Sequence, residues 1–141
     1  MKLTMAAATL LMLAVLCAAC ASTGGEAPKP APTFTEAQKA ELAEGVFKLL
    51  KDRCAECHQA GAPKIYAKID YMLDHEKLVK SRWVKLDAPE RSALYTECEE
   101  GSMPLKLNAD GKPKIKDPLP QAQVEMLLQW LQAGAPKWKG Q

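Results

Sequence analysis

The strongest constraint on the fold of this 141-residue chain is the run C-x-x-C-H at residues 54–58. Its two thiols, Cys54 and Cys57, stand three positions apart, and His58 follows directly. On a tight turn both thiols can reach one bound group while the imidazole lies beside them. Any fold for this chain must therefore leave room for whatever these three side chains hold.

The N-terminus predicts export. A basic start precedes an apolar run that is shorter than a membrane-spanning helix usually needs. We expect residues 1–19 to be a signal peptide of the lipoprotein type with Cys20 as the lipidated N-terminus, and ordinary cleavage after Ala21 is the alternative. Residues 20–34 are rich in Pro, Ala and Gly, which predicts an extended tether. The sequence favours a lipid anchor on the periplasmic side of a bacterial membrane over a soluble periplasmic protein.

In an exported chain, C-x-x-C-H is typical of covalent attachment of haem c. The thiols form thioethers with the haem vinyl groups, and the histidine provides a ring nitrogen to the iron as the proximal ligand.

Three alternative interpretations give the motif another role. A thioredoxin-like redox pair requires a βαβ context, which this sequence lacks. A zinc site requires four ligands, and only Cys98 and His75 could supplement the motif. A plain disulfide would leave His58 without a role.

Apolar residues at helical spacing predict an all-α domain over residues 35–137. Thr35 and Gln38 have capping-box spacing, and we expect Trp130 to pack the last helix against the first. The expected helices are interrupted by a Pro- and Gly-rich loop and cover about residues 36–52, 65–73, 74–82, 87–101 and, after the loop at 102–120, 121–133. With only 6% aromatic residues, so small a domain would gain from a large apolar cofactor in its core.

The chain resembles the class I monohaem cytochrome c domains, in the bacterial branch that runs C-x-x-C-H, a helix, G-x-M-P and a last helix ending in W-x-x-x-G-A-P. These motifs stand here at residues 54–58, 101–104 and 130–136, so the resemblance covers residues 35–137. It implies a small helical fold wrapped around one covalently bound haem c. It also implies a carrier of single electrons between periplasmic donor and acceptor proteins, and not an enzyme.

The resemblance implies Met103 as the distal iron ligand. Met103 also differs from the other methionines in its sequence context. It lies in a loop between Gly101, which ends an expected helix, and Pro104, which fixes the local backbone. A thioether ligand on the iron, together with the histidine, would raise the reduction potential.

Other residues compete for this ligand position. His75 would give a bis-histidine site of lower potential, although a lone histidine between Asp74 and Glu76 is more often solvated. Met72 and Met126 lie in apolar helical patterns, which favours a place in the core. An open sixth position would indicate a haem enzyme or a gas-sensing module. A zinc- or disulfide-bearing structural lipoprotein without haem is the remaining rival class.

Further residues are given supporting roles. The resemblance implies that a backbone carbonyl near Pro63 accepts the proximal imidazole N–H. Cys98 stands among acidic neighbours and is expected to be a buried, inert thiol. Three residues are candidates for binding haem propionates, namely Arg82, Trp83 and Arg91. For the two arginines, a solvated helix face is the commoner environment.

The formal net charge is +2, and no concentrated basic face appears, which excludes a nucleic-acid-binding protein. Lysines do gather in the loop that carries Met103. These lysines are Lys106, Lys112, Lys114 and Lys116. They either steer acidic redox partners toward an exposed haem edge or are solvated loop residues.

Overall fold

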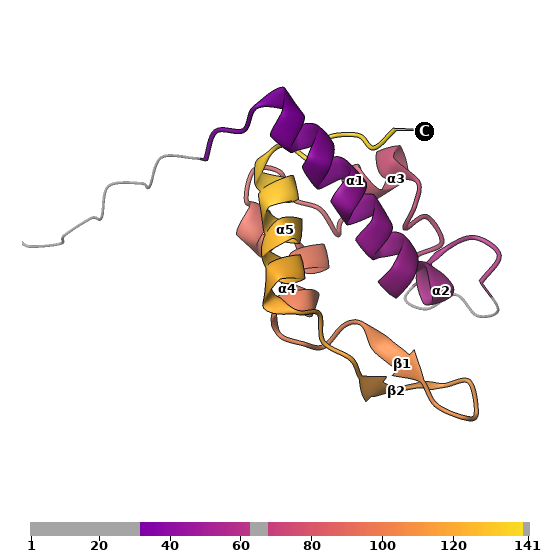
Figure 1. Ribbon diagram of the computed structural model, residues 1–141. Helices are drawn as coiled ribbons and strands as arrows, with labels where there is room; N and C mark the ends of the chain where they lie inside the picture. The colour runs from indigo at the N-terminus through magenta and orange to yellow at the C-terminus, as the bar shows by residue number, and fades with distance from the viewer. Residues whose placement is uncertain (1–31, 63–67, 140–141) are drawn as a thin grey trace, which may run out of the picture. The chain divides into compact units, whose positions relative to one another are not determined.

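The computed structural model describes residues 32–62 and 68–139. Within these ranges helix dominates and regular strand is limited to one antiparallel pair, in agreement with the helix-rich class expected from the sequence. The signal peptide, Cys20 and Pro63 lie outside the described residues, so their roles remain predictions. The elements are, in order, α1 (Glu36–Arg53), α2 (Ala55–His58), α3 (His75–Val79), the 3-10 helix η1 (Pro89–Arg91), α4 (Ala93–Glu99), β1 (Leu105–Leu107), β2 (Pro113–Lys116) and α5 (Gln121–Gln132) (Figure 1).

None of the helices described has the length and apolar character needed to cross a bilayer.

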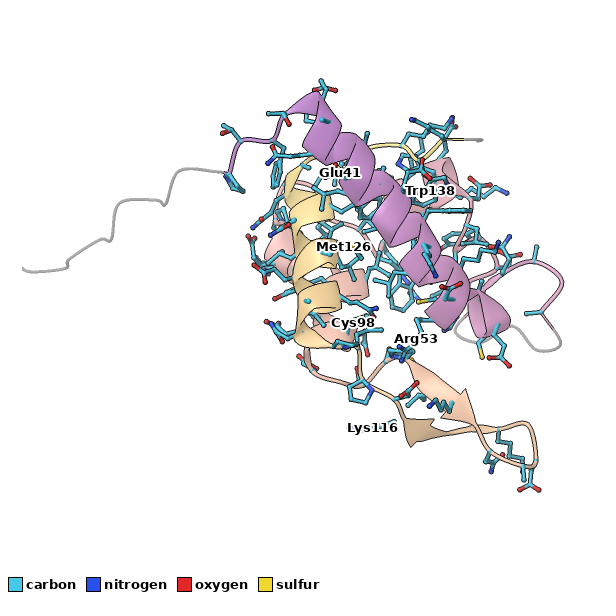
Figure 2. The ribbon with its side chains drawn as sticks, viewed as in Figure 1. Glu41, Arg53, Cys98, Lys116, Met126 and Trp138 are labelled. Atoms are coloured by element: carbon cyan, nitrogen blue, oxygen red, sulfur yellow. The ribbon has the colours of Figure 1, made fainter. Side chains whose placement is uncertain are left out.

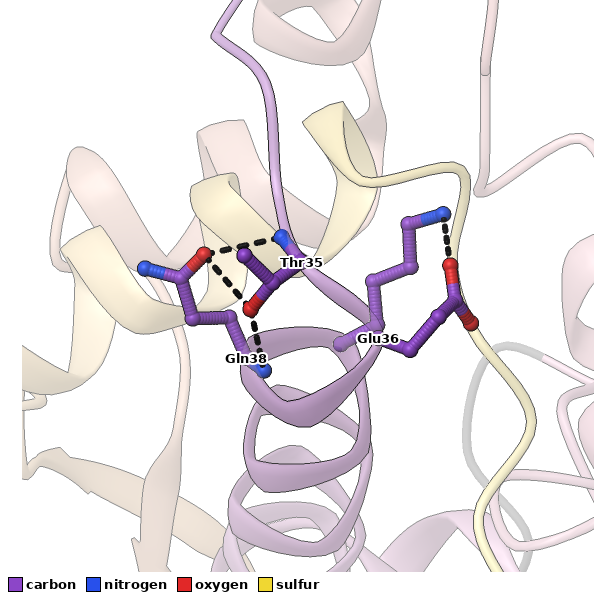
Figure 3. Close-up of polar contacts among 4 residues, drawn as sticks. Thr35, Glu36 and Gln38 are labelled. Atoms are coloured by element: carbon purple, nitrogen blue, oxygen red, sulfur yellow. Dashed lines mark hydrogen bonds and ion pairs between the residues drawn. The ribbon is translucent and has the colours of Figure 1, made fainter.

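Helix α1 begins with the capping box that its sequence predicts (Figure 3). The Gln38 N–H donates to Thr35 Oγ1 at 3.3 Å, and the Thr35 N–H donates to Gln38 Oε1 at 2.9 Å. Two N–H groups that lack partners within the helix are thereby satisfied. At the other end, Lys51 and Arg53 place positive charge in the last turn, where the helix dipole is negative. Helix α1 is thus stabilised at both ends, and it is followed directly by the C-x-x-C-H motif at residues 54–58.

The contact between α1 and α5 forms the centre of the core (Figure 1). Both helices bury one face, and Trp130 belongs to the same buried cluster as Val46 and Leu50, as expected for a residue that packs the last helix against the first. At Gly45, a Cβ atom would lie only 2.7 Å from Met126 Sδ. Met126 (labelled in Figure 2) packs against the core as expected, and the lack of a side chain at Gly45 lets the methionine approach α1.

The expected helix around residues 65–73 is absent where the chain is described, from Lys68 onward. Instead, Tyr71 forms an isolated antiparallel bridge with Gln59, and the Met72 N–H donates to the His58 carbonyl at 3.0 Å. These hydrogen bonds to the chain after the C-x-x-C-H motif replace helical ones. The helix expected at 74–82 is present but shorter, since α3 ends at Val79.

The expected helix at 87–101 is divided in two at Ser92. Ser92 is fully buried and has extended backbone angles, φ −67° and ψ 124°. Its hydroxyl oxygen accepts the Lys85 N–H at 2.9 Å and its hydroxyl faces the Lys85 carbonyl at 3.3 Å. The serine thus bonds to a preceding turn instead of continuing a helix, and α4 starts at the next residue.

The prediction of an irregular loop over residues 102–120 is wrong in its middle, where β1 and β2 form an antiparallel hairpin. Leu105 pairs with Lys116, and the register shifts by a bulge after Lys106. The turn is closed by Asn108, whose Oδ1 accepts the N–H groups of Asp110 at 3.1 Å and Lys112 at 2.8 Å. Side-chain hydrogen bonds of this kind let a short pair of strands form although β2 itself begins with a proline.

Leu127→Ala tests whether the α5 face is the core. Leu127 is 1% exposed, so its truncation should lower the free energy of unfolding by about 2–5 kcal/mol, measured by urea denaturation followed by circular dichroism. Leu86→Ala is the matched control, because Leu86 is 43% exposed, and its loss should stay within about 0.5 kcal/mol. Equal losses in the two variants would contradict the assignment of the core.

Candidate functional site

The C-x-x-C-H motif folds as a single helical turn directly after α1. Cys54 is both the C-cap of α1 and the N-cap of α2. Its carbonyl accepts the N–H groups of Cys57 at 3.2 Å and His58 at 3.0 Å, which winds the two cysteines and the histidine onto one turn. Cys54, Cys57 and Cys98 are not in disulfides.

A cavity of about 340 Å³ opens beside this turn, which is within the usual size range of ligand pockets. Cys54, Cys57 and His58 line it, and so does Met103 from a segment far along the chain. Most of the remaining wall is apolar and includes Ile69, Met72, Trp83, Leu94, Pro104 and Leu105. The structure therefore brings together the two thiols, the imidazole and the loop methionine that the sequence singled out.

Met103 is positioned by the way in which α4 ends. Gly101 has a positive φ of +65°, and its N–H donates to the Cys98 carbonyl at 3.2 Å. The N–H groups of Ser102 and Met103 both donate to the Glu97 carbonyl, at 3.0 and 2.9 Å. The first two bonds form a Schellman motif, in which glycine is favoured because the left-handed backbone is strained with any Cβ. The chain turns back at once, and Met103 reaches the cavity.

Met72 is a second methionine on the cavity wall, which the sequence did not reveal. It is buried, as expected of a core residue, but it also lines the cavity. Its backbone hydrogen bond to His58 places it on the segment paired with the C-x-x-C-H turn, whereas Met103 comes from the separate segment after α4. Only the long-range pairing of residues 59 and 71 puts Met72 here, and no local pattern encodes that pairing.

His75 is not among the residues that line the cavity. Its Nε2 lies 2.9 Å from the Ala135 carbonyl, and its ring meets Trp138 edge-on at 4.9 Å between centroids. The expectation of a solvated histidine was wrong, because α3 packs its first residue against the aromatic side chains near the C-terminus, which also include Trp130 at 6.3 Å. This placement separates His75 from the thiols and the methionine.

The three candidates for propionate binding are placed differently. Trp83 lines the cavity, and the Arg82 guanidinium lies over its ring at 5.2 Å. Arg82 and Arg91 are exposed and are not among the cavity-lining residues. Arg53 does line the cavity, although no sequence pattern indicated this.

Arg53 ties α1 to the segment that follows the hairpin (Figure 2). Its Nη2 donates to the Asp117 carboxylate at 2.8 Å and to the Asp117 carbonyl at 2.9 Å. Lys106 Nζ lies 3.3 Å from the same carboxylate. Both partners of the Arg53–Asp117 pair are about one-third exposed or less, so solvent screens this ion pair only in part.

The lysines near Met103 are on or next to the hairpin. Lys106, Lys112 and Lys116 are exposed, and the charge of Lys106 is partly matched by Asp117. The placement is compatible with both solvation and the steering of an acidic partner.

Burial keeps the three thiols protonated. Desolvation raises the pKa of Cys54 to about 12, with the neighbouring Cys98 adding to the effect. Burial and the nearby Glu97 raise the pKa of Cys98 to about 11, as expected for an inert thiol. Burial, and then Glu56, also raise the pKa of Cys57. Cys98 lies on the cavity wall as well, which the sequence did not predict.

Residues 32–62 and 68–139 contain no ligand set of the kind that the zinc alternative requires. No three His, Cys, Asp or Glu side chains of these residues are grouped so that they could hold a metal ion.

Comparisons with protein-family models, curated proteins and solved structures found no match to this chain.

Asp117→Ala tests the link between α1 and the hairpin segment. Removing the carboxylate leaves Arg53 without its charged partner and should lower the free energy of unfolding by about 1 kcal/mol. The measurement is urea denaturation at low salt. Asp110→Ala is the control, since Asp110 is exposed in the same hairpin, and its effect should stay below about 0.5 kcal/mol. If both variants are as stable as the wild type, the ion pair does not hold these segments together.

Proposed function

We propose that the protein is an exported monohaem c-type cytochrome that carries single electrons between periplasmic donor and acceptor proteins. One observation carries the proposal: Cys54, Cys57, His58 and Met103 line a single, mainly apolar cavity. The first three come from one turn, and the fourth comes from a loop beyond α4. Within the described chain, this is where the chemistry of all four side chains can act on one bound group.

The residues present fit haem c. Two thiols three positions apart on a helical turn suit thioether attachment, and an imidazole next to them suits the proximal iron position. The thioether of Met103 suits the distal position, and apolar walls suit the flat macrocycle. When bound, the haem supplies an iron that takes up and releases one electron.

The side chains of the chain would then have distinct tasks. Cys54 and Cys57 would hold the cofactor covalently, and His58 and Met103 would provide the ligands to its iron. Trp83 and Leu94 belong to the apolar wall against which the macrocycle would pack. Because both iron positions are taken by the protein, the proposal assigns the chain electron transfer without substrate chemistry, so it is a carrier and not an enzyme.

The place of action follows from the N-terminal sequence. Residues 1–19 as signal peptide and Cys20 as lipid anchor would put the domain on the periplasmic side of a membrane, at the end of the 20–34 tether. Haem c attachment and periplasmic redox partners both belong to that compartment. Release after Ala21 would give a soluble periplasmic carrier.

Covalent attachment is tested by haem staining of denaturing gels after export of the full chain in a host that attaches haem c. The wild type should stain, and the Cys54→Ala/Cys57→Ala variant should not, because both thioethers are removed. Cys98→Ala is the matched control, since it removes a thiol of the same cavity and should retain the stain. A colourless wild type would refute the proposal.

Met103→Ala tests the distal ligand. The oxidised wild type should show the far-red charge-transfer band of sulfur bound to iron, and the variant should lose it and bind carbon monoxide when reduced. Met72→Ala is the control, because Met72 lines the same cavity from the His58 side and the band should persist. A band that survives in Met103→Ala, or that disappears in Met72→Ala, would contradict the assignment of Met103 as the distal ligand.

A further inference from the structure

Glu97 is the only acidic residue among the described residues that line the cavity. Among the described residues of the wall, Arg53 is the one Lys or Arg, and its guanidinium pairs with Asp117 at 2.8 Å. Glu97, in contrast, forms no ion pair within residues 32–62 and 68–139. Its Oε2 accepts a hydrogen bond from the neutral Ser102 hydroxyl at 2.5 Å. Glu97 therefore brings the one carboxylate to the described part of the cavity wall, and the Arg53 guanidinium on that wall is ion-paired to a different residue.

The same residue holds the backbone of the proposed iron ligand. The Glu97 carbonyl accepts the N–H groups of Ser102 and Met103 at 3.0 and 2.9 Å. Ser102 Oγ also lies 2.9 Å from this carbonyl, but its single proton is directed to the nearer carboxylate oxygen. Ser102 therefore contacts Glu97 twice, through its N–H to the backbone carbonyl and through its hydroxyl to the carboxylate. The position of the carboxylate is coupled to that of Met103 through one neighbouring residue.

We propose that Glu97 lowers the reduction potential of the cofactor bound in this cavity, with Ser102 as the positioning residue that keeps the carboxylate at the wall. The inference rests on the proposed function. Reduction removes one unit of positive charge from the site, so a nearby carboxylate stabilises the oxidised form relative to the reduced one. The effect is stronger in an apolar cavity than in water, because the effective dielectric constant is lower.

The charge of Glu97 also acts on a neighbouring group of the cavity wall. The pKa of the Cys98 thiol, which lies on the same wall, is raised by burial and, after that, by the charge of Glu97. A group that disfavours a thiolate there favours a more positive iron for the same reason.

The test is the midpoint potential of the haem-loaded, full-length protein, measured by spectroelectrochemical titration at constant pH and salt. Glu97→Gln keeps a hydrogen-bond acceptor for Ser102 but removes the charge. It should favour reduction by about threefold or more, equivalent to a rise of about 28 mV at ~59 mV per tenfold for a one-electron couple. Glu100→Gln removes the same charge from an exposed position outside the cavity lining and should produce a clearly smaller rise.

Ser102→Ala is the second variant, because it keeps the charge and removes only the hydroxyl that positions it. It should raise the potential in the same direction by a smaller amount, and Ser102→Thr should restore the wild-type value. Thr35→Ala, which removes the distant cap of α1, controls for loss of stability and should leave the potential unchanged.

A potential that falls or stays constant in Glu97→Gln overturns the inference, as does an equal rise in Glu100→Gln. These outcomes differ from failure of the proposed function, which would appear in the wild type as a protein without covalent haem.

Discussion

The contact of α5 with two other helices is the interaction on which the site depends. Helix α5 packs against α1, whose last residue leads into Cys54, and also against α4, which leads into the segment that carries Met103. The two halves of the site lie far apart in the sequence and are brought to one cavity by these contacts. Residues of α5 do not line the cavity themselves, so the last helix acts as the scaffold between its walls.

The core and the cavity share residues, which links stability to the bound group. Ile69, Met72, Leu94 and Cys98 belong to the buried cluster and also line the cavity. A domain this small buries a limited share of its apolar surface on folding. An apolar group that fills the cavity would complete the packing of these side chains and would add stability by binding only the folded state. The scarcity of aromatic residues in the sequence is then understandable.

Local signals predicted the fold where a segment's own hydrogen bonds decide its structure. The capping box correctly predicted the start of α1, and the apolar spacing correctly predicted α5. The C-x-x-C-H spacing indicated three residues that line the cavity. Prediction failed where distant partners decide. Ser92 breaks a helix through its bonds to Lys85, and residues 69–73 pair with the chain after His58 instead of forming a helix. The roles of Met72, Arg53 and Glu97 follow from such pairings, so no local pattern revealed them.

Peptide mass spectrometry tests the central claim most directly. Trypsin cleaves after Arg53 and Lys64, so the fragment of residues 54–64 contains the whole C-x-x-C-H motif. For the protein exported by a host that attaches haem c, we predict that this fragment carries the mass of one haem, bound through both cysteines. A fragment with the mass of the bare peptide, as free thiols or as a disulfide, would contradict the account.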